Sequence, residues 1–152
     1  MYAPNLAAVC IDKFNRREAA GRIYNRVSEE PINFSSLLQM IEHMDFYYDR
    51  INFPQAATEI RSFKNVRKKR PETNIREKAK VDIEKITKQR GKQGTFIVHV
   101  QYRQNATWQG QVVWAEKNKV QKFRSVLELL KLIDNALENE DIKEETENIA
   151  AI

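Results

Sequence analysis

The densest run of side chains that could do chemistry is cationic and lies in the middle of the chain. Residues 61–92 hold thirteen lysines and arginines against four acidic side chains, a net charge of +9, whereas the whole chain is only +5. Clustered ammonium and guanidinium groups are typical of proteins that contact nucleic-acid phosphates. The nucleic-acid-binding residues predicted on this ground are Arg61, Lys64, Arg67, Lys68, Lys69, Arg70, Arg76, Lys78 and Lys80. The alternative is a solvated linker helix whose charges pair at i,i+4 spacing, as Glu84 and Lys88 would.

Aromatic side chains are scarce in this basic segment, so the sequence does not predict base stacking there. They gather instead near the end of an expected helix, where Phe46, Tyr47, Tyr48 and Phe53 are more than one helical face can bury. We therefore predict that Phe46, Tyr47 and Phe53 form part of a patch that binds a partner or a second copy of the chain. The two tryptophans fall on strand faces that we expect to point into the core.

Residues suited to catalysis are few. Cys10 is the single cysteine, His43 and His99 are the two histidines, and none has the spacing of a zinc site, a phosphate-binding loop or a nucleophile with its base. We therefore expect a non-catalytic protein that needs no cofactor or metal. One alternative stays open for Cys10 and His99, because a neighbouring imidazolium would lower the thiol pKa if the two met. Otherwise they are unrelated side chains on the back of a sheet, and His43 is an ordinary helix-boundary histidine.

The sequence contains an internal repeat, which predicts where these residues lie in the fold. A shift of 89 positions superimposes 21–45 on 110–134 without a gap, and it pairs Gly21 with Gly110. Each copy reads as three strands and a helix, because alternating apolar residues are followed by an apolar stripe at helical spacing. A duplicated unit predicts an architecture rather than an activity.

The expected elements begin and end at recognisable signals. Ser36 with Gln39, and Ser125 with Glu128, have the spacing of a capping box, which predicts a helix start at each serine. The segment 6–14 alone also fits a helix, and we assign it as a strand because its counterpart alternates clearly. In chain order, the expected elements are strands at 6–14, 21–27 and 32–34, a helix from 36 to near 54, strands at 95–103, 108–114 and 120–124, and a helix from 125 to 137.

Each copy, at about 45 residues, is too small to bury a core of its own, so we expect the two to pack as one domain. The predicted fold class is α+β: a duplicated β-β-β-α unit that forms a pseudo-twofold antiparallel sheet packed with two helices, with a helical charged linker between the copies. Linker helices are expected at 55–63 and from Pro71 to near residue 90. The predicted parts are a first copy at 1–54, a basic and partly helical linker at 55–93, a second copy at 94–139 and an acidic flexible tail at 140–152.

Composition also predicts a compartment. No apolar run approaches the roughly 18 residues of a membrane span, and the first residues lack the basic start of a signal peptide. A lone cysteine fits a reducing environment. We therefore expect a cytoplasmic protein with no membrane partner, as a monomer or a homodimer.

Two strings carry a family resemblance. Residues 34–37 (FSSL) and 101–110 (QYRQNATWQG), followed by Phe123-Arg124-Ser125, resemble an uncharacterised family of short proteins from Gram-positive gut bacteria and their mobile elements. The resemblance implies a cytosolic bacterial setting and a role linked to a mobile element. It implies no activity and no functional residues.

Three functions follow from these observations. The first is binding of nucleic acid or a ribonucleoprotein through residues 61–92. The second is inhibition of a host defence nuclease by a mobile-element protein, in the manner of an anti-CRISPR. The third is sensing of a small ligand in a pocket between the repeats, because ligand pockets favour such junctions.

Overall fold

The computed structural model describes residues 3–15, 18–58, 61–63 and 79–150, without the side chains of 139–150, and every statement below concerns this part of the chain. It is an α+β protein, as predicted. Its elements are β1 (Ala7–Asn15), β2 (Glu18–Asn25), β3 (Ile32–Phe34), α1 (Leu37–Ile51), α2 (Ile83–Thr87), β4 (Gly94–Tyr102), β5 (Gln109–Trp114), β6 (Lys119–Phe123) and α3 (Val126–Ala150).

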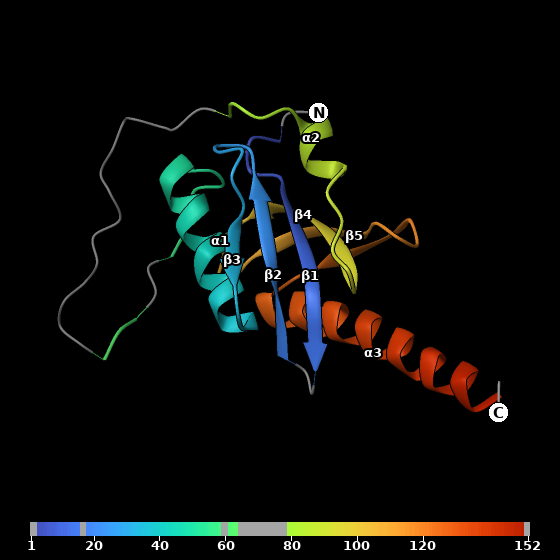
Figure 1. The fold of residues 1–152 in the computed structure, drawn as a ribbon. Helices are drawn as coiled ribbons and strands as arrows, with labels where there is room; N and C mark the ends of the chain where they lie inside the picture. Colours follow the sequence, from blue (N-terminus) through green and yellow to red (C-terminus); the bar gives the residue numbers. More distant parts are fainter. Residues whose placement is uncertain (1–2, 16–17, 59–60, 64–78, 151–152) are drawn as a thin grey trace.

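The strands form a single six-stranded sheet in the order β3-β2-β1-β4-β5-β6, and each neighbouring pair is antiparallel (Figure 1). The segment 6–14 is therefore a strand, as expected from its counterpart. β1 and β4 meet at the centre, where Ala8 lies opposite Ile97 and Val9 lies opposite Phe96. Successive side chains of a strand point to opposite faces of the sheet, so Val9 faces the helices while Ala8 faces away.

Several backbone features recur at positions that differ by 89. The register shifts between Ile11 and Lys13 in β1, and again between Val100 and Tyr102 in β4. Gly21 pairs with Phe34 and Gly110 pairs with Phe123. Added Cβ atoms at Gly21 and Gly110 would collide with the carbonyl oxygens of Cys10 and His99, so both positions require glycine for close strand approach.

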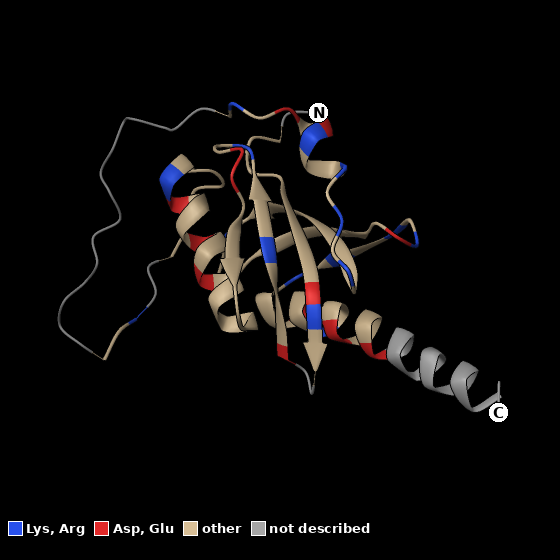
Figure 2. Ribbon diagram, viewed as in Figure 1, with Lys and Arg blue, Asp and Glu red and all other residues tan. Residues whose placement is uncertain are grey.

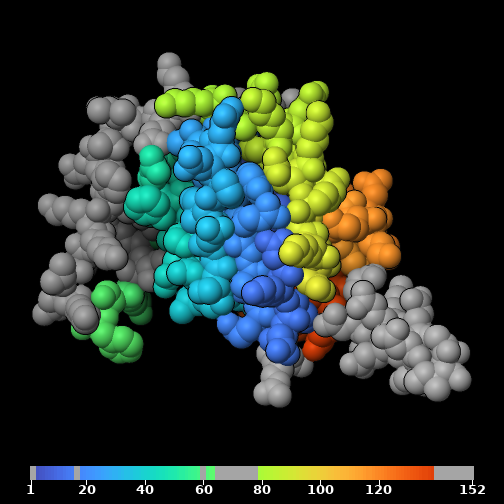
Figure 3. Space-filling model, viewed as in Figure 1, coloured from blue at the N-terminus to red at the C-terminus, as the bar shows by residue number. Residues whose placement is uncertain are grey.

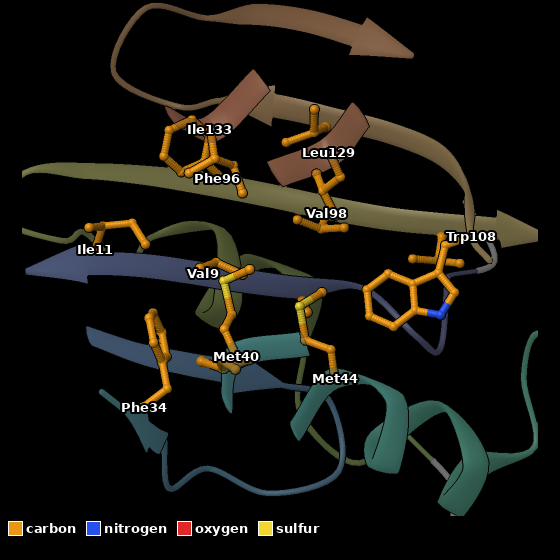
Figure 4. Close-up of a cluster of buried hydrophobic side chains, with 14 of the residues drawn as sticks. Val9, Ile11, Phe34, Met40, Met44, Phe96, Val98, Trp108, Leu129 and Ile133 are labelled. Carbon is orange, nitrogen blue, oxygen red and sulfur yellow. The ribbon is translucent and has the colours of Figure 1, made fainter. Parts of the chain in front are cut away.

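Both long helices pack on one face of the sheet and enclose the main core (Figure 4). Val9 and Val98 from the central strands meet Met44 of α1 and Leu129 of α3, all fully buried. Burying such a side chain stabilises the fold by about 1.5–3 kcal/mol. Trp108, predicted to be in the core, is 4% exposed there.

The two helix starts match the predicted capping boxes. The Ser36 hydroxyl accepts a hydrogen bond from the Gln39 backbone N–H at 3.1 Å, and the Ser125 hydroxyl accepts one from that of Glu128 at 3.0 Å. The Gln39 side chain in turn accepts from the Ser35 N–H at 2.7 Å. These bonds satisfy backbone donors that the first helical turn leaves without partners.

The outer face of the sheet, turned away from α1 and α3, is partly covered by residues 79–93, which we call the strap (Figure 3). Val81 and Ile86 of the strap pack with Ala8 in a small second core. Backbone hydrogen bonds fasten both ends: Lys80 N–H donates to the Arg26 carbonyl at 2.7 Å, and Gln93 N–H donates to the Ile11 carbonyl at 2.8 Å. Tyr24 of β2 and Ile97 of β4 also pack against this small core, so the strap lies across strands of both halves of the sheet.

The segments predicted as linker and tail differ most from expectation. The helix expected from Pro71 to near residue 90 is present in the described chain only as the five residues of α2, since 79–82 are not helical. The helix expected at 55–63 is absent from the described residues there, and Ala56 instead forms a bridge with Arg103. α3 continues to Ala150, so the backbone of 140–150 is helical.

No helix in the described part of the chain is both long enough and apolar enough to cross a membrane.

Candidate nucleic-acid interface

The structure describes two of the nine predicted nucleic-acid-binding residues. Arg61 and Lys80 are both exposed. The other seven, Lys64, Arg67, Lys68, Lys69, Arg70, Arg76 and Lys78, lie outside the described residues. Lys80 stands at the point where the basic segment reaches the sheet, and its backbone is held there by the Arg26 carbonyl.

Lys80 faces a cavity of about 530 Å³, which we call the α1 groove. It lies between α1 and the connection from β2 to β3, with Lys80 closing one side. Its walls combine a hydrophobic floor with three basic or titratable side chains, His43, Arg50 and Lys80, and one acidic side chain, Glu30. The remaining lining residues are Asn25, Val27, Ser28, Pro31, Ile32, Phe46 and Tyr47.

Phe46 provides a solvent-exposed aromatic ring in this groove. Its side chain is 62% exposed, and the Arg50 guanidinium lies 5.7 Å from the centre of its ring. The two residues are four apart on α1, the spacing that brings side chains together on a helix. An exposed ring beside a cation is the combination that binds a stacked base and its phosphate.

The other two predicted partner-binding aromatics are less accessible. Tyr47 is 4% exposed, and its hydroxyl donates a hydrogen bond to the Pro4 carbonyl at 2.6 Å. Burial raises the pKa of Tyr47 to about 12. Phe53 is partly buried against the main core. The prediction for Tyr47 is therefore corrected: its ring is part of the core, because the face of α1 that carries it turns towards the sheet.

A second cavity, of about 310 Å³, lies on the other side of the β2–β3 connection and is lined by Lys85 and Lys88 of the strap. It shares Asn25 and Ser28 with the α1 groove. The Asn25 side-chain oxygen accepts hydrogen bonds from the N–H groups of Val27 and Ser28 at 3.0 and 3.1 Å, which fixes the turn between the cavities.

Basic side chains line both cavities, Arg50 and Lys80 in the first and Lys85 and Lys88 in the second, together with the acidic Glu30 and Glu29. Figure 2 shows blue ribbon at the end of α1 and in α2, with red ribbon between them. Lys85 forms an exposed ion pair with Glu29 at 3.1 Å. For Lys80, the described residues offer no ion pair closer than 4.0 Å. Exposed ion pairs are weak, so Lys85 can exchange Glu29 for a phosphate.

Two arginines that the sequence did not single out hold this site in place. The Arg26 guanidinium donates to the Val81 carbonyl at 3.0 Å and to the Ala3 carbonyl at 2.9 Å, which ties the strap to the end of β2 and to the residues before β1. Arg103, only 4% exposed, binds Asp49 of α1 at 2.6 Å and the Pro54 carbonyl at 2.6 Å. No local pattern distinguishes these arginines from solvated ones, because their partners are distant in sequence.

Cys10 and His99 do not meet. Cys10 lies opposite Thr95, whereas His99 lies opposite Gln111. Burial raises the pKa of the Cys10 thiol to about 11, with a smaller opposing effect from Arg22, and burial lowers the pKa of His99. Neither shift activates a thiolate near neutral pH. The described residues also contain no group of three potential metal ligands.

Comparisons of the chain with protein-family models, with curated proteins and with solved structures find no match.

Proposed function

We propose that this protein is a non-catalytic binding protein for single-stranded nucleic acid, free or within a ribonucleoprotein. The basic segment 61–92 would contact phosphates, and the α1 groove would take a base on Phe46. The observation that carries the proposal is the exposed Phe46 ring, which lies beside Arg50 in a groove of about 530 Å³ that Lys80 closes.

The groove supplies what the basic segment lacks. Cations alone bind phosphates without distinguishing a duplex from a single strand. An exposed ring stacks on the face of an unpaired base and is sequence-tolerant, because every base has such a face. Lys80 lies in the basic segment and also lines the groove. A nucleic-acid strand bound along the basic segment would therefore continue into the groove.

We also infer that the two halves arose by duplication and are related by a pseudo-twofold axis between Ala8 and Ile97. These two residues pair directly and differ by 89 positions, and the flanking pairs Ala7 with Val98 and Val9 with Phe96 exchange under the same shift. The matching register shifts and the paired glycines support this origin.

Fluorescence anisotropy with labelled single-stranded RNA and DNA of about 20 nucleotides tests the function. We expect wild-type affinity to fall steeply as salt rises from about 50 to 200 mM. Replacing Arg67, Lys68, Lys69 and Arg70 with glutamine removes four cations, and should lower the magnitude of the log–log salt slope by up to about 2.8, at about 0.7 per phosphate contact. Unchanged affinity and slope in this variant would reject a role for the basic segment.

The groove is tested separately with Phe46→Ala, which should weaken binding about tenfold through loss of one base stack. Tyr102→Ala is its matched control, because Tyr102 is a similarly exposed aromatic, 58% against 62%, on the last residue of β4. Equal effects of the two substitutions would show that Phe46 has no special role. Lys80→Gln should reduce the salt slope by about 0.7, and Lys131→Gln on α3 should leave it unchanged.

The nuclease-inhibitor hypothesis makes a different prediction for the same protein. It requires a stoichiometric complex with a protein nuclease that survives digestion of nucleic acid. A pull-down performed with and without added nuclease separates the two. Partners that vanish on digestion support the nucleic-acid proposal, and a nuclease retained after digestion supports the inhibitor.

The third hypothesis placed a ligand pocket between the repeats. One cavity lined by described residues of both halves, Asp45, Ala56, Arg103 and Trp108 among others, has a volume of about 20 Å³. That is room for about one water molecule. The junction is otherwise filled by core side chains such as Met44 and Leu129 (Figure 4). This cavity is too small to hold a metabolite.

A further inference from the structure

The second half of the molecule has its own cavity, of about 210 Å³, between β5, β6 and α3. We call it the apolar pocket. Phe96, Val112, Trp114 and Leu132 contribute apolar walls, and the exposed side chains of Lys119 and Gln121 stand at its mouth. It is separate from the α1 groove, which lies at the opposite edge of the sheet.

The two cavities occupy corresponding places, each between an edge strand and the helix of its half. Their lining residues match at positions that differ by 89, yet the chemistry of the match changes. The aligned pairs are Asn25 with Trp114, Glu30 with Lys119, Ile32 with Gln121, His43 with Leu132, Phe46 with Asn135 and Tyr47 with Ala136. The second cavity therefore has its aromatic ring on the sheet and its charge on the edge strand.

The pocket's aromatic wall is held rigidly. The rings of Trp114 and Phe96 stack with their centres 6.4 Å apart and their planes inclined by 20°. The two residues are direct cross-strand neighbours on β5 and β4, so the strand register fixes the stack. A fixed ring face is a surface on which a second ring packs at little entropic cost.

The strand register also fixes the position of the positive charge at the mouth of the pocket. Lys119 lies directly opposite Trp114 in the β5–β6 pair, so both side chains are on the same face of the sheet. Among the residues that line the pocket, Lys119 is the one that carries a formal charge at neutral pH. An occupant that places a ring against Trp114 would therefore meet one cation, and no anion among the described residues that line the pocket.

We propose that the apolar pocket binds a small aromatic carboxylate. The ring packs on Trp114 between Val112 and Leu132, and the carboxylate reaches Lys119 and the Gln121 amide. A volume of about 210 Å³ is below the roughly 300–1,000 Å³ of pockets for drug-sized ligands, so a single ring with one short acidic group is the size that fits. This proposal does not rest on nucleic-acid binding.

The test is a titration of the full chain with benzoate, followed by two-dimensional ¹H–¹⁵N NMR. Acetate and benzyl alcohol serve as probes that lack the ring or the charge. We expect saturable shifts for benzoate at the Trp114 indole N–H and at the backbone of 119–121. Acetate should cause no saturable shift at these positions, and benzyl alcohol should bind more weakly than benzoate.

Three variants separate the pocket from general effects. Leu132→Trp fills the cavity and should abolish saturable binding, while its NMR spectrum shows whether the fold is retained. Lys119→Gln should weaken benzoate binding about two- to fivefold, as expected for one exposed ion pair. Lys122→Gln is the matched control, because Lys122 is exposed on the same strand but points to the opposite face.

Three outcomes would overturn the proposal: no saturable shift at millimolar benzoate, shifts confined to other parts of the molecule, or equal effects of Lys119→Gln and Lys122→Gln. If Lys119→Gln alone has no effect but Leu132→Trp abolishes binding, the pocket binds aromatic rings without selecting the carboxylate, and the proposed ligand class is wrong. None of these results depends on Phe46 or on the basic segment.

Discussion

The α1 groove and the apolar pocket lie at corresponding places in the two halves, yet they suit different partners. The groove is about 530 Å³ and holds Arg50 and Lys80 beside the exposed Phe46 ring. The pocket is about 210 Å³ and presents a fixed aromatic wall with one lysine at its mouth. The comparison shows that the strand–helix junction supplies a cavity, and that the side chains at a few positions decide its chemistry.

The strap accounts for much of the difference. It packs on Ala8 and is fastened to Arg26, and it contributes Lys80 to the first cavity. It also reaches Ile97 of β4, whereas Val120 of β6, at the far edge of the sheet, is 55% exposed. One inserted segment therefore makes two similar halves chemically unequal.

The largest expected loss of stability tests whether the strands approach each other equally closely at a glycine in both halves. Gly21→Ala and Gly110→Ala should each destabilise the protein by about 2–3 kcal/mol, because the new methyl group meets a backbone carbonyl that cannot move aside. Urea unfolding monitored by circular dichroism measures both. Gly94→Ala is the control, since its added carbon would lie 3.1 Å from the movable side-chain atom Leu137 Cδ2. Similar costs at all three glycines would contradict the account.

A loss of stability of intermediate size at alkaline pH is expected from Cys10 but not from His99, the residue 89 positions later. Burial raises the pKa of the Cys10 thiol from 9.0 to about 11, so the folded state holds its proton over a range in which the unfolded state releases it. Stability from this residue is complete below about pH 9 and declines as the pH rises towards 11. Between about pH 8 and pH 10, the wild type should lose about 1 kcal/mol more stability than Cys10→Ala.

The comparison with Cys10→Ala is essential, because lysines and tyrosines also begin to titrate in that range and affect both proteins alike. His99→Gln provides the counterpart from the second half and should retain the wild-type alkaline decline. Identical alkaline profiles for the wild type and Cys10→Ala would contradict the burial of the thiol in the folded state.

The smallest effect concerns the two helix starts. Ser36→Ala and Ser125→Ala should each cost about 1 kcal/mol, the usual value for losing a capping hydroxyl. Thermal unfolding of the two variants and of Ser35→Ala, whose hydroxyl does not cap the helix, measures the difference. A loss at one helix only would show that the two starts are not equivalent in energy.

The sequence predicted the strands and the helix starts well because local patterns determine both. Segment 6–14 was ambiguous alone, and the alternation of its counterpart at 95–103 correctly indicated a strand. The capping residues Ser36 and Ser125 were recognisable from spacing. These features depend on a few adjacent residues, and similar residues recur 89 positions later.

The strap and the groove could not be predicted in the same way. α2 is only five residues long, and its position depends on Arg26 and Ala8, which lie more than fifty residues earlier. Tyr47 and Phe46 are adjacent in sequence, and only the docking of α1 on the sheet decides that the first is buried and the second exposed. Long-range contacts of this kind leave no periodic signal.

The most direct measurement of the central claim is photo-cross-linking of the intact protein to single-stranded RNA that contains 4-thiouridine, followed by tryptic mass spectrometry. The account predicts cross-links in peptide 27–50, which contains Phe46, and their loss in Phe46→Ala but not in Tyr102→Ala. Cross-links confined to peptide 132–143 of the second half, or equal cross-linking in Phe46→Ala and the wild type, would contradict it.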